Sequence, residues 1–131
     1  MKINTEQCPL PITKNLTNII HKEIFNSGLD ADKGLILNFR DPDYSAETGG
    51  FHPVEIMINN GEISYITDFA YVGLQFPELV KEIDFDFSAG IFGHMGRDHP
   101  IEMGTELYQI WEDNFVEYHR MGVYQVTVTE L

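Results

Sequence analysis

A β-hairpin signal near the middle of the chain constrains the fold more than any other feature. Residues 54–58 place Val or Ile at every second position, and residues 62–69 alternate again after the turn sequence Asn59-Asn60-Gly61. Asn and Gly both tolerate the positive φ angles that the tightest hairpin turns require. The pattern therefore predicts two antiparallel strands joined by a short turn.

Other segments share this two-residue period. Residues 35–40 are apolar enough for a central strand, and residues 123–129 predict a last strand that closes the chain. In residues 82–88 every second side chain is Ile or Phe, while the others are acidic or Ser. This alternation predicts a half-buried strand. Residues 71–80 stay unassigned, because Pro77 cannot donate to a strand ladder.

Two segments have the three- and four-residue spacing of an amphipathic helix. The first runs from Thr13, a suitable N-cap, to Gly28, a suitable stop. The second ends at Gly122 and follows residues 93–100, a Gly- and His-containing stretch that is predicted to be a loop. Their apolar positions are Leu16, Ile19, Ile20 and Ile24 in the first helix and Leu107, Ile110, Trp111, Phe115 and Tyr118 in the second.

The order of these elements predicts an α+β fold. We expect a single antiparallel sheet of about five to seven strands, an N-terminal helix and a helix near the C-terminus packed on one face, and a final strand. A parallel nucleotide-binding fold is disfavoured, because strands and helices do not alternate. Residues 1–131 are expected to form a single domain with residues 1–12 as an irregular lead-in.

The charge of the chain narrows the choice of partner. Eight Lys and Arg residues stand against 21 Asp and Glu residues, which gives a formal net charge of −13. Such a field repels phosphate backbones and anionic lipids, so we expect neither nucleic acid nor a membrane as partner, and a basic protein instead. The single cysteine, Cys8, and the absence of a long apolar segment favour the cytoplasm.

Carboxylates are expected to gather on the outer face of the sheet. Between Asp41 and Val80 the sequence contains no Lys or Arg to neutralise them. A concentrated negative face can steer a basic partner. The alternative is a solvated face whose charge prevents aggregation of sheet edges. The residues expected on this face are Glu55, Glu62, Asp68, Glu82, Asp84 and Asp86.

The histidines suggest a second kind of site. His94, Asp98 and His99 lie close together in the sequence and could bind a metal ion, but their spacing matches no metal signature. No metal or cofactor is therefore predicted, and the loops near His52 and His94–His99 remain an alternative site for a ligand. No nucleophile elbow or phosphate-binding glycine loop is found, so no catalytic residue is assigned.

Several strings resemble the bacterial family Domain of Unknown Function 2787. They are residues 38–45 (NFRDPDYS), 49–56 (GGFHPVEI), 65–69 (YITDF), 77–84 (PELVKEID), 114–115 (NF), 117–119 (EYH) and 121–124 (MGVY). Members of this family occur in Vibrio and related marine gammaproteobacteria, often among genes of mobile or pathogenicity islands. The resemblance implies no enzymatic activity.

That family is similar in fold to the mitochondrial acidic matrix proteins, the best known of which binds the globular head of complement C1q. Those proteins are acidic, carry a twisted antiparallel sheet flanked by terminal helices, and assemble as rings. This chain shares the acidity and the order of elements, but it is shorter and ends in the extra strand at residues 123–129. The resemblance implies a protein-binding role and leaves formation of a homo-oligomer open.

Three functions are therefore considered. The first is an acidic, non-enzymatic protein-interaction module that uses the outer sheet face. The second is a small metal- or ligand-binding protein that uses the loops near His52 and His94–His99. The third is an enzyme whose motif cannot be recognised in the sequence. An ordered cation or a closed polar pocket would favour the second or third, and a broad acidic surface would favour the first.

Overall fold

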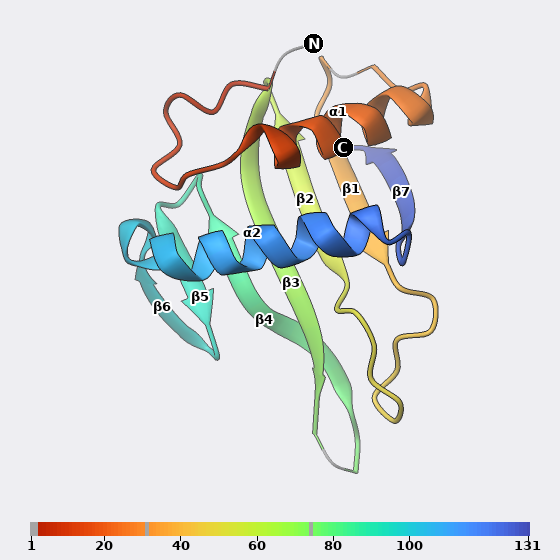
Figure 1. Cartoon of the computed structure of the whole chain (residues 1–131). Helices are drawn as coiled ribbons and strands as arrows, with labels where there is room; N and C mark the ends of the chain where they lie inside the picture. Colours follow the sequence, from red (N-terminus) through yellow and green to blue (C-terminus); the bar gives the residue numbers. More distant parts are fainter. Residues whose placement is uncertain (1–2, 31, 74) are drawn as a thin grey trace.

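One antiparallel sheet of seven strands carries the fold in the computed structural model, which describes residues 3–30, 32–73 and 75–131 (Figure 1). The strands are β1 (Leu35–Arg40), β2 (Val54–Asn59), β3 (Glu62–Val72), β4 (Glu78–Asp86), β5 (Ile91–His94), β6 (Arg97–Pro100) and β7 (Gln125–Glu130). Their order across the sheet is β6-β5-β4-β3-β2-β1-β7. Residues 1 and 2 of the expected lead-in lie outside the described residues.

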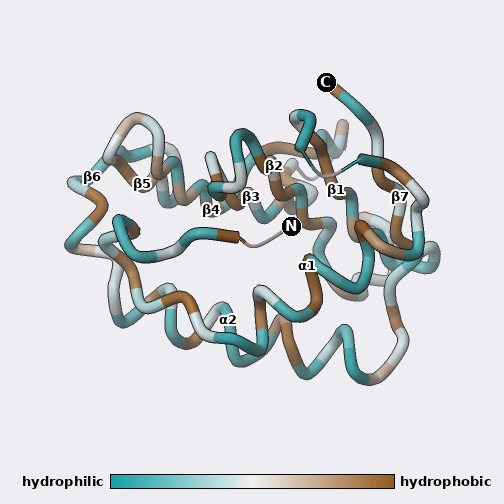
Figure 2. The backbone as a smooth tube through the Cα atoms, turned by 90° about the horizontal axis from the view of Figure 1, so that it is seen from above, coloured by the Kyte–Doolittle hydropathy of each residue, from teal (hydrophilic) through white to brown (hydrophobic). Residues whose placement is uncertain are grey.

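Both helices lie on the same face of this sheet (Figure 2). They are α1 (Lys14–Ser27) and α2 (Thr105–Arg120), and the short 3-10 helix η1 (Ile101–Gly104) leads into α2. The predicted α+β architecture, with its helices on one face and a strand at the end, is confirmed. Neither helix, nor any other in the part of the chain that the structure describes, is long and apolar enough to cross a membrane.

The core fills the space between the helices and the sheet. The predicted stripe of α1 is buried as expected, whereas Ile110 of α2 is 60% exposed and Tyr108 is buried in its place. The buried line of α2 therefore lies slightly to one side of the predicted stripe. The largest fully buried side chains include Leu16 and Ile20 from α1, Tyr108 and Phe115 from α2, and Leu35, Leu37, Phe39, Ile56, Ile58, Ile66 and Phe85 from the sheet.

The predicted hairpin between β2 and β3 is present. Asn60 and Gly61 have φ angles of 54° and 74°, as a tight turn of this kind requires. A second hairpin, β5 and β6, replaces the loop predicted for residues 93–100, because Met95 and Gly96 also have positive φ angles and form a similar turn. The prediction of a loop at residues 93–100 is therefore wrong. Methionine is unusual in such a turn, so the hairpin was not recognised.

A β-bulge in β3 changes which side chains face the helices. Ile58 pairs with Ile63, but the preceding residue, Met57, pairs with Tyr65, so Ser64 is an extra residue in β3. An extra residue reverses the alternation of all the residues that follow it in the strand. From Tyr65 onward, β3 therefore presents the opposite set of side chains to each face.

A second bulge lies in β4, opposite Asp68 and Phe69 of β3. Asp68 pairs with Ile83, but Phe69 pairs with Lys81, which leaves Glu82 as the extra residue. Residues 83–86 keep the predicted alternation, so Phe85 is buried as predicted. The face of the sheet that carries no helix, which we call the bare face, carries Glu55 of β2, Tyr65 of β3, and Asp84 and Asp86 of β4, with Thr67 of β3 buried beneath them.

Beyond this second bulge, β3 and β4 continue as a long hairpin that extends past the other strands (Figure 1). Residues 71–80, which the sequence left unassigned, belong largely to this hairpin: β3 reaches Val72 and β4 begins at Glu78. Pro77 immediately precedes β4, where it removes no ladder hydrogen bond. Residue 74 lies outside the described residues.

Candidate functional site

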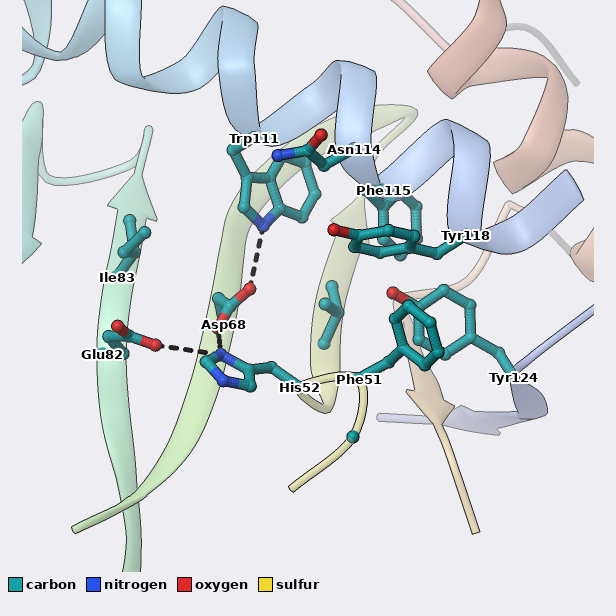
Figure 3. A pocket seen from close by; sticks show the side chains of 12 residues that line it. Phe51, His52, Asp68, Glu82, Ile83, Trp111, Asn114, Phe115, Tyr118 and Tyr124 are labelled. Atoms are coloured by element: carbon teal, nitrogen blue, oxygen red, sulfur yellow. Dashed lines mark hydrogen bonds and ion pairs between the residues drawn. The ribbon is translucent and has the colours of Figure 1, made fainter. Parts of the chain in front are cut away.

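A pocket of about 360 Å³ lies between α2 and the sheet, and we call it the α2 pocket (Figure 3). Phe, Tyr and Trp side chains line much of it, and one imidazole and two carboxylates lie at one end. Among the residues that the structure describes, no Lys or Arg lines it. Its lining residues are Gly50, Phe51, His52, Val54, Asp68, Glu82, Ile83, Trp111, Asn114, Phe115, Tyr118 and Tyr124.

His52, Asp68 and Glu82 meet at that end and form what we call the His52 cluster. His52 Nδ1 lies 2.9 Å from Asp68 Oδ1 and 2.9 Å from Glu82 Oε2. The indole Nε1–H of Trp111 donates a hydrogen bond of 3.0 Å to the other oxygen of Asp68 (Figure 3). One carboxylate oxygen is thus held by the helix, and the other is left facing the imidazole.

The loop between β1 and β2 positions His52. Asp41, at the start of this loop, accepts a hydrogen bond of 3.0 Å from the backbone N–H of Phe51 through Oδ2. Gly50 has a φ of 133°, and a Cβ atom there would lie 2.8 Å from the same Asp41 oxygen. Glycine is therefore needed at position 50, both for the backbone angle and for the close approach of Asp41.

Asp68 and Glu82 owe their positions to the two bulges. Asp68 pairs with Val54, a buried residue of the helix-covered face, because the extra Ser64 reverses the alternation of β3. Glu82 is itself the extra residue of β4 and reaches His52 on the same side. The prediction that Asp68 and Glu82 point away from the core is therefore wrong.

One signal in the sequence pointed to this reversal. Ile66 belongs to the same alternating set as Asp68, and Ile66 is fully buried. The apolar positions Ile63 and Ile66 are three residues apart, whereas an unbroken strand would place them two or four apart. A break of this kind in the two-residue period indicates a bulge.

The surroundings of His52 favour its protonated form. The hydrogen bond to Asp68 raises the pKa of His52 above its ordinary value of 6.5; partial burial opposes this, and the nearby charges of Asp68 and Glu82 add to it. The exposed fractions of the side chains are 38% for His52, 13% for Asp68 and 31% for Glu82. The cluster is therefore partly open to solvent at His52 and Glu82 and largely closed at Asp68.

The carboxylates on the bare face have different partners. The hydroxyl of Tyr65 donates to Glu55, and that of Thr67 donates to Asp84 at 2.7 Å. Burial, followed by the hydrogen bond to Glu55 and the charges nearby, raises the pKa of Tyr65 above its ordinary value of 10.0. Lys81 Nζ lies 3.9 Å from Asp84 Oδ2. Glu55, Asp84 and Asp86 thus surround one phenol.

Glu62, the sixth predicted carboxylate, is exposed next to the β2–β3 turn. It lines a second cavity, of about 450 Å³, between that turn and the lead-in. Cys8 lines the same cavity, and burial raises the pKa of its thiol. Glu62 therefore lies apart from the three carboxylates that surround Tyr65.

The structure does not bring His94, Asp98 and His99 together on one face. His94 pairs with Ile83 and His99 pairs with Phe92, which are both on the helix-covered side, whereas Asp98 pairs with Gly93 on the other side. Among the residues that the structure describes, the His52 cluster is the one set of three His, Cys, Asp or Glu side chains whose ligand atoms all lie within 4.8 Å.

A buried glutamate that sequence reasoning missed ties the lead-in to α2. Glu112 is 3% exposed and accepts hydrogen bonds from the hydroxyl of Tyr108 and from the backbone N–H and hydroxyl of Thr13. Thr13 does occupy the N-cap position of α1, but its side chain binds Glu112 and makes no capping hydrogen bond. Burial, and then the bond to Glu112, raises the pKa of Tyr108 well above its ordinary range.

The solved structures that match this chain include two proteins of Vibrio cholerae. A hypothetical protein from the VSP-II pathogenicity island is 37% identical, with a TM-score of 0.80, and the match covers 92% of this chain and 95% of that one. A conserved hypothetical protein from the pathogenicity island VPI-2 is 39% identical, with a TM-score of 0.78 and the same coverage, and is described as sharing structural homology with the human p32 protein.

None of the curated proteins matches the chain significantly. Residues 13–129 match the family described as protein of unknown function DUF2787, which agrees with the resemblance of the sequence strings. The matched range includes both helices, six of the strands and all but the last residue of β7. This chain belongs to the DUF2787 family.

Proposed function

We propose that this protein is a non-enzymatic interaction module whose bare face binds a basic protein partner. The observation that carries this proposal is that both helices lie on one face of the sheet (Figure 2). The opposite face is therefore available over several neighbouring strands. An open sheet surface that spans several strands is suited to contact with another protein.

The chemistry of the bare face fits a basic partner. Glu55, Asp84 and Asp86 gather around Tyr65, and Lys81 is the one cation that the structure shows within 4.0 Å of any of them. An aromatic centre with a charged surround is the composition of many protein interfaces. The negative field of these carboxylates would accelerate the approach of a cationic surface.

The properties of the whole chain support the same proposal. A net charge of −13 disfavours nucleic acid and anionic membranes as partners. One relative shares structural homology with the human p32 protein, and the acidic matrix proteins that this family resembles bind other proteins. We extend to this chain the pathogenicity-island origin of its relatives, and we infer that it acts in the cytoplasm, as a single cysteine favours.

The experiment compares two variants that remove the same charge from opposite sides of the molecule. A partner is first isolated from the native cell extract at low salt and eluted at high salt. Its affinity is then measured for the wild type and for the double variant Asp84→Asn/Asp86→Asn. The matched control is Glu106→Gln/Asp113→Asn, which changes two exposed carboxylates on α2.

We expect the bare-face variant to lower affinity roughly 2-fold to 30-fold, since an exposed ion pair contributes about 0.2–1 kcal/mol. Added salt should slow association more than it speeds dissociation. An equal loss in the control would mean that only net charge matters. Unchanged affinity in the bare-face variant would mean that the partner binds elsewhere.

A further inference from the structure

We propose that the His52 cluster is a binding site for one divalent first-row transition-metal ion. Its three side chains come from three different parts of the chain: the β1–β2 loop supplies His52, β3 supplies Asp68 and β4 supplies Glu82. Their ligand atoms converge at one end of the α2 pocket (Figure 3). This site is separate from the bare face and goes beyond the proposed interaction with a basic protein.

The spacing of the donor atoms suits a metal ion. His52 Nδ1 lies 2.9 Å from an oxygen of each carboxylate, and all three atoms lie within 4.8 Å of one another. In an octahedral shell with bonds of about 2.1 Å, neighbouring ligand atoms are about 3 Å apart. The cluster could therefore form one face of such a shell with small movements of its side chains.

The ligands are held in place by groups outside the cluster. The indole N–H of Trp111 binds one oxygen of Asp68 and leaves the other for the ion. The backbone next to His52 is fixed by the hydrogen bond from Phe51 to Asp41. Supporting hydrogen bonds of this kind orient the ligands of metal sites and strengthen binding. A chance contact of surface charges would not need such support.

The donor set indicates which ions would bind. One imidazole nitrogen and two carboxylate oxygens suit Mn²⁺, Fe²⁺, Co²⁺ and Zn²⁺, whereas Mg²⁺ and Ca²⁺ prefer oxygen alone and Cu⁺ prefers sulfur. Cys8, the only cysteine of the chain, lines the other cavity and supplies no ligand. Since the described lining residues include no Lys or Arg, the two carboxylates leave a negative charge that a divalent ion would neutralise.

The single tryptophan of the chain provides a direct readout. Zn²⁺ is titrated into the metal-free protein, and the indole N–H resonance of Trp111 is followed by ¹⁵N-resolved NMR, because this group donates to the ligand Asp68. Calorimetry on the same sample gives the stoichiometry. We expect one Zn²⁺ per chain and a shift of the indole resonance that saturates at one equivalent. Mg²⁺ at the same concentration should leave the resonance unchanged.

Two variants test the ligands without disturbing the core. His52→Ala and Glu82→Gln change side chains that are partly exposed, and each should weaken Zn²⁺ binding at least about tenfold, since even supporting residues of metal sites have effects of this size. The matched control is Asp84→Asn, which removes a carboxylate from the bare face of the same strand and should leave the affinity unchanged. The NMR spectrum of each variant reports whether it is folded.

Three outcomes would overturn the proposal: no stoichiometric Zn²⁺ binding, wild-type affinity in both folded ligand variants, or an equal loss of affinity in Asp84→Asn. A response to Mg²⁺ as strong as that to Zn²⁺ would overturn the assigned class of ion. These results are independent of partner binding, which Asp84→Asn/Asp86→Asn alters and Glu82→Gln leaves intact. Failure of one proposal is therefore distinguishable from failure of the other.

Discussion

Carboxylates on the neighbouring strands β3 and β4 lie in different surroundings, depending on which face of the sheet they occupy. Asp68 lies under α2, with 13% of its side chain exposed, and contacts His52 and Trp111. Asp84 lies on the bare face, with 24% of its side chain exposed, and accepts a hydrogen bond from Thr67. The comparison shows that an acidic residue in a strand of this protein can be part of a polar cluster or part of a surface, depending on a single bulge.

The largest expected effect separates the core from the bare face on adjacent residues of β4. Phe85 is 1% exposed and packs against Phe92, Tyr108 and Trp111. Replacing Phe85 by Ala should lower the free energy of unfolding by about 3–5 kcal/mol because it leaves a cavity. Asp84→Asn should change it little. Urea unfolding measures both, and small, equal effects would contradict the position of β4.

A smaller effect on stability should separate Asp68 from Asp84. An amide has one acceptor oxygen, so Asp68→Asn cannot accept from both the Trp111 indole and a protonated Nδ1 of His52, and it should lower the free energy of unfolding by about 1.5–3 kcal/mol. In Asp84→Asn the amide oxygen can still accept the hydrogen bond from Thr67. Urea unfolding at neutral pH is again the measurement. Equal losses would mean that the side of the sheet is unimportant.

The pH dependence of stability should distinguish the two faces further. The pKa of His52 is raised in the folded protein, so its stabilising contribution is fully present below the ordinary value of 6.5 and is lost as pH rises through the folded value. The advantage of wild type over His52→Gln should therefore be larger at pH 5.5 than at pH 8.5. The change should stay below about 1 kcal/mol because His52 is partly exposed. An advantage that grows with pH would contradict this sign.

The smallest expected effect is on stability when charge is removed from the bare face. The free energy of unfolding of the triple variant Glu55→Gln/Asp84→Asn/Asp86→Asn should lie within about 0.5 kcal/mol of the wild-type value. Any change should be a slight increase, because the variant relieves self-repulsion. The variant that also carries Glu82→Gln should lose the negative charge of the contact with His52 and be less stable than the triple variant. Thermal and urea unfolding compare the pair. A marked loss in the triple variant would indicate that these carboxylates support the fold.

The net charge gives one prediction that applies to both faces. Duplex DNA of mixed sequence should not bind with useful affinity at physiological salt, since a charge of −13 opposes the phosphate field. A gel shift at sub-micromolar protein concentration would contradict this prediction.

Much of the fold follows from local patterns in the sequence. The boundaries of α1, the turn at Asn60 and Gly61 and the burial of Phe85 all agree with residue spacing and turn chemistry. Each of these features depends on residues close together in the chain. The acidic character that motivates the proposed interaction is likewise a property of composition.

The candidate metal site depends on the tertiary structure instead. The spacing of Ile63 and Ile66 indicates a break in the alternation of β3, but the extra residues Ser64 and Glu82 are defined only by the pairing of β3 with β2 and β4. Those two pairings turn Asp68 and Glu82 toward His52, which arrives from a loop fixed by Asp41. The sequence by itself determined both helices, most of the strands, the charge and one face of β4, but not the hairpin of β5 and β6. Only the packing of the strands against one another and under α2 decided which carboxylates meet, because that choice depends on contacts between residues far apart in the chain.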